Sequence, residues 1–143
     1  AGLVDVVVDE EGRPVDLDPE TSDLAGQAPW IEQCYRSDDP VAILRALSAR
    51  PEPAAREAAE LIATRSPLSV GVALEAVRRA ERAAGLEEVL ATDRALGHAF
   101  MRRSDFAEGV RAQLVDKDRR PRWRHSSIGE VPRAEIEAMF DAD

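Results

Sequence analysis

The sequence predicts a mainly α-helical protein with one short strand near its N-terminus. From Trp30 onward, apolar residues recur at helical spacing between repeated stop and start signals. Only residues 3–8 (LVDVVV) form a β-branched apolar run, which is typical of a strand or strand end. Prolines, glycines and acidic residues crowd residues 12–29, as in a surface connection. We therefore divide the chain into a strand end with an acidic connecting segment (residues 1–28) and a helical region (residues 29–143).

The first helices of this region are predicted from their capping residues. Asp39-Pro40 places a capping carboxylate before a proline at the first helical position, and this helix is expected to end near Ala49. The next helix spans about residues 53–65, with Ala58, Leu61 and Ile62 expected on its buried face. Ser66-Pro67 then caps a third helix, for which Gly85 is well placed as a left-handed C-cap.

The later helices follow from spacing as well as from caps. A helix is expected from Leu86 to about Arg103, with an inward face that includes Leu86, Val89, Leu90, Leu96 and Phe100. Asp105 with Glu108 resembles a capping box, and the i, i+4, i+8 residues behind it (Phe106, Val110 and Leu114) are expected to face inward. Gly109, inside that helix, suggests that another backbone or a ligand comes close. Pro132 opens a last helix with Ile136, Met139 and Phe140 inward.

Composition indicates a globular protein and argues against a membrane protein. Hydrophobic residues make up 44% and charged residues 33% of the 143 residues, which is typical of a globular protein. No run approaches the ~20 apolar residues of a membrane helix, so no membrane partner is expected. The single cysteine, Cys34, cannot form an internal disulfide, and we expect a cytoplasmic location. The chain begins with Ala1 instead of Met, so its first residue is not expected to be a plain translation start.

Charge is unevenly distributed along the chain. Residues 1–40 carry 11 acidic and 2 basic side chains, which accounts for the whole net charge of -9. Residues 102–124 form a basic island of eight basic against four acidic residues. This island is either a solvated surface or a site for phosphates. We expect no nucleic acid, because the whole chain is acidic and only Trp123 stands among the bases as a stacking platform.

No complete catalytic set is visible in the sequence. His98 and His125 lie far apart, without ligands at metal-site spacing, and both are interpreted as structural. Ser66 lacks the surroundings of a nucleophile elbow, and an N-cap role explains it. Capping likewise explains Glu108. We therefore predict no catalytic residue and no metal ligand in this chain.

Three motifs resemble a known family. Residues 104–112 (SDFAEGVRA) resemble the C-terminal signature of the enoyl-CoA hydratase/isomerase (crotonase) superfamily, and D-F-x-E-G-V-R-A occurs throughout it. Residues 116–123 (DKDRRPRW) contain D-K-D-x-x-P-x-W, which is similar to the 3-hydroxyisobutyryl-CoA hydrolase branch. Ser66-Pro67-Leu68-Ser69 resembles the Ser-Pro-x-Ser of the same family. The resemblance covers about residues 29–141, and it implies the helical C-terminal part of a crotonase-like α/β fold.

The resemblance also implies a function. It suggests part of an acyl-CoA thioester hydrolase of valine catabolism, in which these helices cover the CoA site and make oligomer contacts. The family's oxyanion hole and catalytic acids precede the matched region, so this chain alone is expected to be inactive. Lys117 is similar to the family's lysine that can approach the adenine or phosphate end of CoA, and Arg111 and Arg120 are weaker candidates. No cofactor is implied, since coenzyme A is part of the substrate.

Two alternatives stay open at this point. The same helices could belong to an enoyl-CoA hydratase or isomerase, or the chain could be a non-enzymatic helical interaction module. The expected partners are an acyl-CoA substrate, the remaining crotonase core on the same or a separate chain, and further copies in a homo-oligomer.

Overall fold

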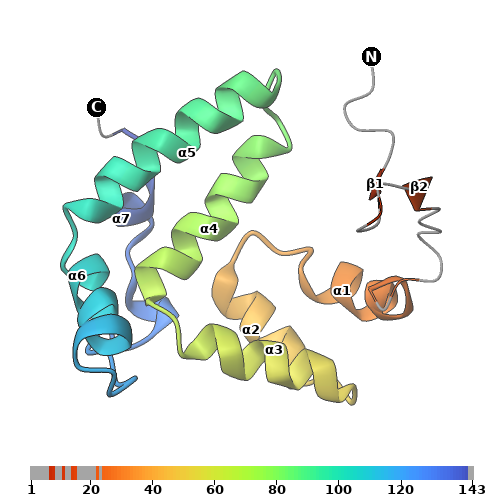
Figure 1. Cartoon of the computed structure of the whole chain (residues 1–143). Helices are drawn as coiled ribbons and strands as arrows, with labels where there is room; N and C mark the ends of the chain where they lie inside the picture. Colours follow the sequence, from red (N-terminus) through yellow and green to blue (C-terminus); the bar gives the residue numbers. More distant parts are fainter. Residues whose placement is uncertain (1–6, 9–10, 12–13, 16–21, 23, 142–143) are drawn as a thin grey trace. The chain divides into compact units, whose positions relative to one another are not determined.

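The computed structural model describes residues 7–8, 11, 14–15, 22 and 24–141 (Figure 1). It comprises two units, Ala1–Gln33 and Cys34–Asp143. In the first unit, β1 (Val7–Val8) pairs antiparallel with β2 (Pro14–Val15), and η2 (Ala25–Gln27) leads into α1 (Ala28–Cys34). Residues 3–6 lie outside the described part, so a strand over residues 3–8 stays a prediction. The predicted boundary at residue 28/29 falls at the first residues of α1 and also stays a prediction.

The second unit is helical, as predicted. Its elements are α2 (Pro40–Ser48), α3 (Pro53–Ala63), α4 (Pro67–Ala80), α5 (Leu86–Met101), α6 (Ser104–Val110), the π-helical turn η3 (Arg111–Val115), the 3₁₀ turn η4 (Ile128–Glu130) and α7 (Arg133–Glu137). Helix α4 is central, because it contacts α2, α5, α7 and η4, while α3 packs on α2 (Figure 1). No described helix is long and apolar enough to cross a membrane.

Two predicted helix starts are confirmed in atomic detail. The Asp39 carboxylate accepts a hydrogen bond from the Val41 N–H at 2.9 Å, with Pro40 as the first helical residue of α2. The Ser66 hydroxyl accepts one from the Ser69 N–H at 3.3 Å at the start of α4. Each side chain satisfies a backbone N–H that has no partner within its helix.

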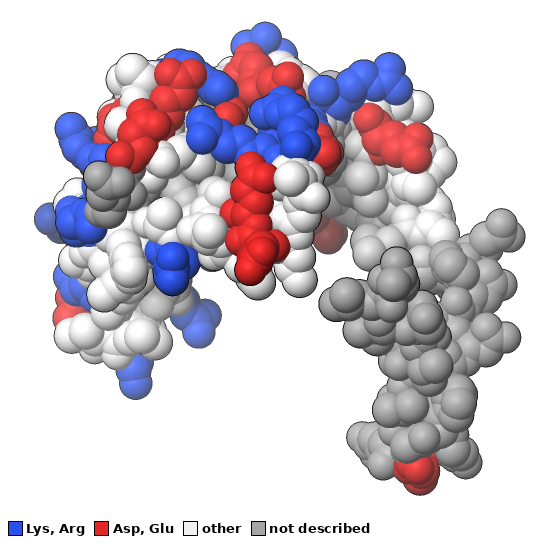
Figure 2. All heavy atoms as spheres, turned by 90° about the horizontal axis from the view of Figure 1, so that it is seen from above, with Lys and Arg blue, Asp and Glu red and all other residues white. Residues whose placement is uncertain are grey.

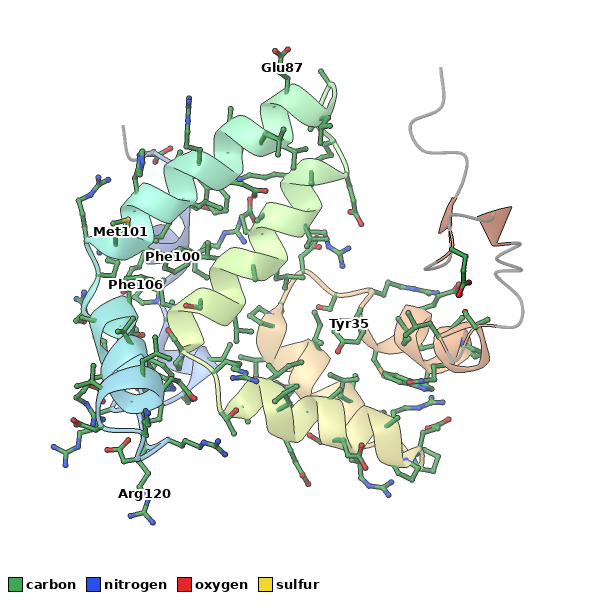
Figure 3. All side chains as sticks on the ribbon, in the orientation of Figure 1. Tyr35, Glu87, Phe100, Met101, Phe106 and Arg120 are labelled. Carbon is green, nitrogen blue, oxygen red and sulfur yellow. The ribbon has the colours of Figure 1, made fainter. Side chains whose placement is uncertain are left out.

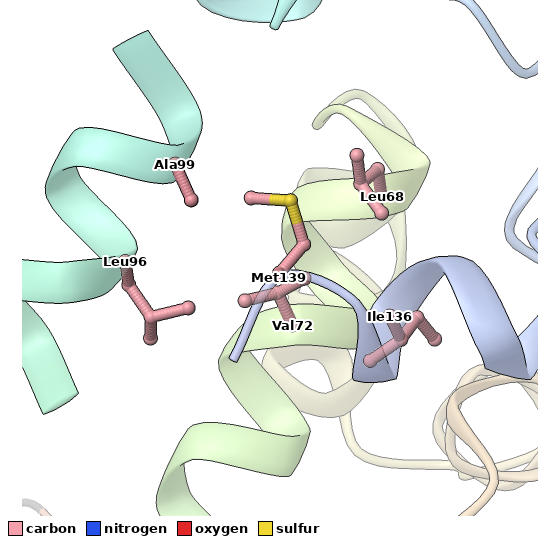
Figure 4. Packing of buried hydrophobic residues seen from close by; sticks show 6 residues of the cluster. All are labelled: Leu68, Val72, Leu96, Ala99, Ile136 and Met139. Atoms are coloured by element: carbon pink, nitrogen blue, oxygen red, sulfur yellow. The ribbon is translucent and has the colours of Figure 1, made fainter. Parts of the chain in front are cut away.

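The core lies where α4, α5 and the C-terminal segment meet. Its buried residues are Leu68, Val72, Leu96, Ala99, Ile136 and Met139. Met139, fully buried, lies between the side chains of α4 and those of α5 (Figure 4). Gly71 permits the contact between α4 and α7, because a Cβ at this position would lie only 2.6 Å from Cδ1 of Ile136. The predicted inward positions of the last helix are thus confirmed for Ile136 and Met139, and Phe140 is partly buried.

The predicted C-cap at Gly85 is wrong. Helix α4 ends at Ala80, and Gly85, with φ 171°, has an extended backbone at the N-cap position of α5. The turn between the two helices is held by Glu88, whose Oε2 accepts a hydrogen bond from the Ala84 N–H at 2.9 Å. A first-turn glutamate that reaches back stabilises the start of α5, so the glycine is not needed to end α4.

Several apolar residues predicted to face inward are exposed. Phe106, Val110 and Leu114 have exposed fractions of 47%, 36% and 68%, whereas Asp105 and Ala112 occupy the buried positions of this segment. Leu61, Leu86 and Leu90 are also exposed, and small alanines are buried in α3 in place of leucine. Tertiary contacts of small and charged residues decide which positions are buried here, and hydrophobic periodicity along the sequence does not detect such contacts.

Candidate functional site

Arg111 and three carboxylates form a compact cluster at the end of α6. Glu108 lies on α6, Arg111 begins η3, and Asp116 and Asp118 lie in the loop that follows. The Arg111 guanidinium reaches all three carboxylates, and we call these four residues the Arg111 hub. The hub occupies the middle of the predicted basic island, so most of the negative charge of that island is gathered around one arginine.

Every N–H of the Arg111 guanidinium has an acceptor. Its Nε and Nη2 donate to the two oxygens of Glu108 at 2.9 and 2.8 Å, a bidentate pair. Its Nη1 donates to Asp116 Oδ2 at 2.5 Å and to Asp118 Oδ2 at 2.8 Å. The second N–H of Nη2 donates to the carbonyl oxygen of Arg120 at 3.2 Å. An arginine has five side-chain N–H groups, and all of them bind atoms of this chain.

The hub holds its members in their charged forms. Hydrogen bonds from Arg111 and from the Arg122 N–H lower the pKa of Glu108 to about 2. Bonds from Arg111 and from the Arg120 N–H likewise lower the pKa of Asp118. The carboxylates raise the pKa of Arg111, Glu108 contributing most. At neutral pH the hub therefore contains one cation and at least two firmly ionised carboxylates.

Two carboxylates of α6 also hold the chain that runs past them. Glu108 Oε1 accepts from the Arg122 N–H at 2.7 Å, and Asp105 Oδ1 accepts from the Arg124 N–H at 2.8 Å. The other oxygen of Asp105 accepts from the Ser66 hydroxyl at 2.5 Å. The predicted capping box is therefore wrong: Arg103 occupies the N-cap position without a side-chain bond, and both acids bind groups distant in sequence.

Trp123, which follows the loop, packs against α6. Its indole Nε1 donates to the Thr64 carbonyl oxygen at 3.1 Å. Its ring lies over Gly109, where a Cβ would be 3.4 Å from the nearest ring carbon. The expected close neighbour of Gly109 is thus a side chain instead of a backbone or a ligand. Because its N–H is bound and its ring packs on α6, Trp123 acts as an anchor of the loop.

The loop of residues 116–122, which carries Asp116 and Asp118 of the hub, contains two residues with left-handed backbone conformation. Lys117 and Arg119 have φ values of 55° and 53°, which are uncommon for residues other than glycine. Three backbone donors fix the positions around them: the Asp116 N–H binds the Arg111 carbonyl oxygen at 2.8 Å, the Arg119 N–H binds the Ala112 carbonyl oxygen at 3.0 Å, and the Arg120 N–H binds the Asp118 carboxylate at 2.9 Å. The hydrogen bonds of the hub hold the backbone in this strained conformation.

Four cations on this loop are exposed. They are Lys117, Arg119, Arg120 and Arg122, and none forms an ion pair with a carboxylate of the described residues. Arg120 projects away from the helices (Figure 3). Of the three predicted CoA-binding residues, Lys117 and Arg120 thus form no ion pair with another described residue, whereas Arg111 lies inside the hub. On the face seen in Figure 2, basic and acidic side chains lie intermixed.

The described part of the chain contains no group of three metal-ligating side chains. His125 Nε2 lies 2.9 Å from Glu135 Oε2, so this histidine joins the segment before η4 to α7. Sequence reasoning missed this partner, which lies ten residues further along the chain. Two clefts, of about 330 and 240 Å³, lie elsewhere and include no hub residue.

The fold and these motifs define the class of protein. The chain belongs to the enoyl-CoA hydratase/isomerase family, whose model matches residues 3–140. Among curated relatives, it is similar to the mitochondrial 3-hydroxyisobutyryl-CoA hydrolases of Rattus norvegicus and Homo sapiens. Each is 32% identical over 110 residues, which cover 77% of this chain and 28% of the relative. The chain thus spans little more than a quarter of the length of these relatives.

Two solved structures have the same fold as this chain. A carnitinyl-CoA dehydratase from Mycobacterium thermoresistibile is 44% identical with a TM-score of 0.78, over 87% of this chain and 35% of that protein. An enoyl-CoA hydratase from Rhodobacter sphaeroides 2.4.1 is 30% identical with a TM-score of 0.81, over 91% of this chain and 38% of that protein. The expected relation to crotonase-superfamily enzymes is confirmed.

Proposed function

We propose that this chain is the C-terminal portion of an acyl-CoA thioester hydrolase similar to 3-hydroxyisobutyryl-CoA hydrolase. In this proposal the loop of residues 116–122 binds a phosphate of CoA. The observation that carries it is the loop itself: its D-K-D-x-x-P-x-W residues build a fixed turn from which Lys117 and Arg120 extend without a carboxylate partner among the described residues. A phosphate would supply the missing anion.

The chemistry of such an enzyme would reside elsewhere in a longer protein. The hub carboxylates are bound by Arg111 and by backbone N–H groups, so they are poor proton acceptors at neutral pH. Thioester hydrolysis would need a stabilised oxyanion and a general base, and we assign neither to the described residues. We therefore predict that the 143-residue chain alone has no turnover.

Lys117, the single lysine of this chain, gives the sharpest test. In a protein of the relatives' full length that carries this segment, Lys117→Ala should raise the KM for 3-hydroxyisobutyryl-CoA about tenfold and leave kcat unchanged, as for the loss of one charged hydrogen bond. Arg45→Ala, which removes an exposed arginine of α2, is the control. CoA binding should also protect Lys117 from an amine-reactive reagent, read by mass spectrometry. An unchanged KM together with unchanged labelling would refute the CoA site.

A hydratase or dehydratase is the second candidate. It is favoured by the carnitinyl-CoA dehydratase structure, whose identity of 44% exceeds that of the hydrolases. The two candidates differ in product, so one assay separates them. Release of free CoA from 3-hydroxyisobutyryl-CoA supports the hydrolase, whereas addition of water to crotonyl-CoA without CoA release supports the hydratase. Family membership favours either enzyme over a non-enzymatic module.

The exposed apolar side chains suggest the partner. Met101, Phe106, Leu114 and Val115 are all between 47% and 69% exposed, and Figure 3 shows the first two near the junction of α5 and α6. We propose that the remainder of the longer protein covers them, because the relatives are more than three times the length that this chain matches. Phe106→Glu with Leu114→Glu should then abolish binding of a separately expressed core to this chain. Unchanged binding, or self-association of the chain through these residues, would refute this assignment.

The remaining expectations also stand as proposals. We propose a homo-oligomer, a cytoplasmic location, and no cofactor other than the coenzyme A of the substrate. Sedimentation of the full-length protein with and without acyl-CoA, and its cofactor content after purification, would test the first and the last of these.

A further inference from the structure

We propose that Arg111 is a positioning residue for the CoA site: it sets the shape of the loop that presents Lys117 and does not touch the ligand itself. This inference rests on the proposed CoA-binding function. Its basis is the number of donors, since the five N–H groups of Arg111 are all bound to Glu108, Asp116, Asp118 and the Arg120 carbonyl oxygen. A phosphate could bind Arg111 only if one of these bonds were broken.

The bonds of Arg111 bracket Lys117 on both sides. Asp116 and Asp118, its two neighbours in sequence, both bind Nη1 of Arg111. The Arg111 carbonyl oxygen also accepts the Asp116 N–H. Lys117 is therefore held in its left-handed conformation between two residues that are fixed to the same guanidinium. A change in the hub changes the direction in which the lysine leaves the loop.

A lysine at position 111 would not reproduce this arrangement. It keeps the positive charge but offers at most three donors from a single nitrogen, whereas Arg111 binds five acceptors with its planar fork: four carboxylate oxygens of the hub and the Arg120 carbonyl oxygen. Glu108 would lose its bidentate partner, and the carboxylates of Asp116 and Asp118 would repel each other more strongly. Arg111→Lys thus separates the role of geometry from the role of charge.

The test uses a protein of full length and the steady-state kinetics of its CoA thioester. Arg111→Lys should raise the KM about tenfold, as Lys117→Ala does, with kcat unchanged. In the Lys117→Ala background it should cause no further increase, because Arg111 acts through Lys117. The matched control is Arg50→Lys, since Arg50 also holds a glutamate with two N–H groups, at 2.9 and 2.7 Å, outside this loop.

Two kinetic outcomes overturn the proposal. If the effects of Arg111→Lys and Lys117→Ala on KM multiply in the double variant, Arg111 contacts the ligand directly. If Arg111→Lys leaves KM at the wild-type value, charge alone is sufficient. Should Arg111→Lys fail to fold, Asp118→Asn replaces it, because asparagine has one oxygen for the two donors that Asp118 binds, Nη1 of Arg111 and the Arg120 N–H, while Arg111 itself is retained.

A second readout does not depend on CoA. Arg111→Lys should increase the hydrogen-exchange rate of the Asp116 and Arg119 amides at least tenfold, whereas Arg50→Lys should not. If Lys117→Ala leaves KM unchanged and CoA does not protect Lys117 of the wild-type protein from labelling, the CoA function fails. Faster exchange at these two amides then still supports the positioning of the loop, and unchanged exchange overturns that as well.

Discussion

The buried carboxylate of Asp105 is expected to be the most sensitive single point of the second unit. The residue is 6% exposed, and its two carboxylate oxygens bind the Ser66 hydroxyl at 2.5 Å and the Arg124 N–H at 2.8 Å. A hydrogen bond to a charged group contributes about 1.5–3 kcal/mol. Asp105→Ala removes two such bonds and leaves both donors without an acceptor, so it should lower the free energy of unfolding by about 3–5 kcal/mol.

Companion variants separate the two bonds. Asp105→Asn keeps an oxygen for Arg124 and offers an amide donor to Ser66, and should cost about 1 kcal/mol. Ser66→Ala loses both the N-cap of α4 and the bond to Asp105, and should cost about 2 kcal/mol. The double alanine variant should show a coupling energy of about 1–2 kcal/mol.

The assay is urea unfolding of the chain at pH 7, followed by circular dichroism at 222 nm with linear extrapolation. Asp93→Ala, which removes an exposed carboxylate of α5, is the control and should lie within about 0.5 kcal/mol of wild type. If Asp105→Ala also lies within that range, or if the Ser66 and Asp105 effects simply add, our account of this carboxylate is wrong.

Three further predictions concern the helix contacts and the hub. Gly71→Ala should destabilise the chain by about 1–3 kcal/mol, because the added Cβ would lie 2.6 Å from Cδ1 of Ile136. Gly109→Ala should instead stabilise it by about 0.5–1 kcal/mol, because the nearest atom to its Cβ would be 3.4 Å away. Chemical denaturation measures the sign of both changes. Lys117→Gly should be more stable than Lys117→Ala by about 1 kcal/mol in the same assay, because glycine adopts a φ of 55° without strain. Glu108 has a pKa lowered from 4.5 to about 2, so its stabilising contribution is complete above pH 4.5 and lost as the pH falls through 2. The protection of the Arg122 amide, which is the intrinsic exchange rate relative to its measured rate at the same pH, should fall over this interval, and Glu108→Gln should abolish this change in protection.

Local signals in the sequence predicted the starts of α2 and α4 in the second unit. Asp39-Pro40 and Ser66-Pro67 need only their own side chains and the next turn of backbone, and both caps are present. The inward faces of the last helix were also predictable, because Ile136 and Met139 pack on a core of ordinary hydrophobic residues. These elements require no knowledge of distant partners.

The candidate site could be located from the sequence, but the roles within it could not. The motif led to Arg111, Lys117 and Arg120, yet spacing alone assigned Glu108 to a capping box. The actual partners of Glu108 are a side chain three residues away and a backbone N–H 14 residues away. A local pattern and a tertiary bond compete for the same carboxylate, and the sequence specifies only the first.

The apolar residues of α6 and η3 also show that burial could not be predicted from local sequence patterns. Periodicity identified Phe106, Val110 and Leu114 as one stripe of a single helix, whereas α6 ends at Val110 and Leu114 lies in the π-helical turn η3. It could not show that Asp105 and Ala112 take the buried positions, because burial of Asp105 depends on donors from Ser66 and Arg124. The predicted C-cap at Gly85 was wrong for a related reason, since Glu88 holds the turn that the glycine was expected to make.

The arrangement of charge around Arg111 makes the loop respond to salt in two different ways. Inside the hub, ions are in direct contact at 2.5–2.9 Å, well within the Debye length of about 8 Å at physiological ionic strength. Around it, Lys117, Arg119, Arg120 and Arg122 are exposed to solvent, where added salt screens their attraction for a distant anion. Ionic strength should therefore change how fast a polyanion is drawn to this loop while the loop itself keeps its shape.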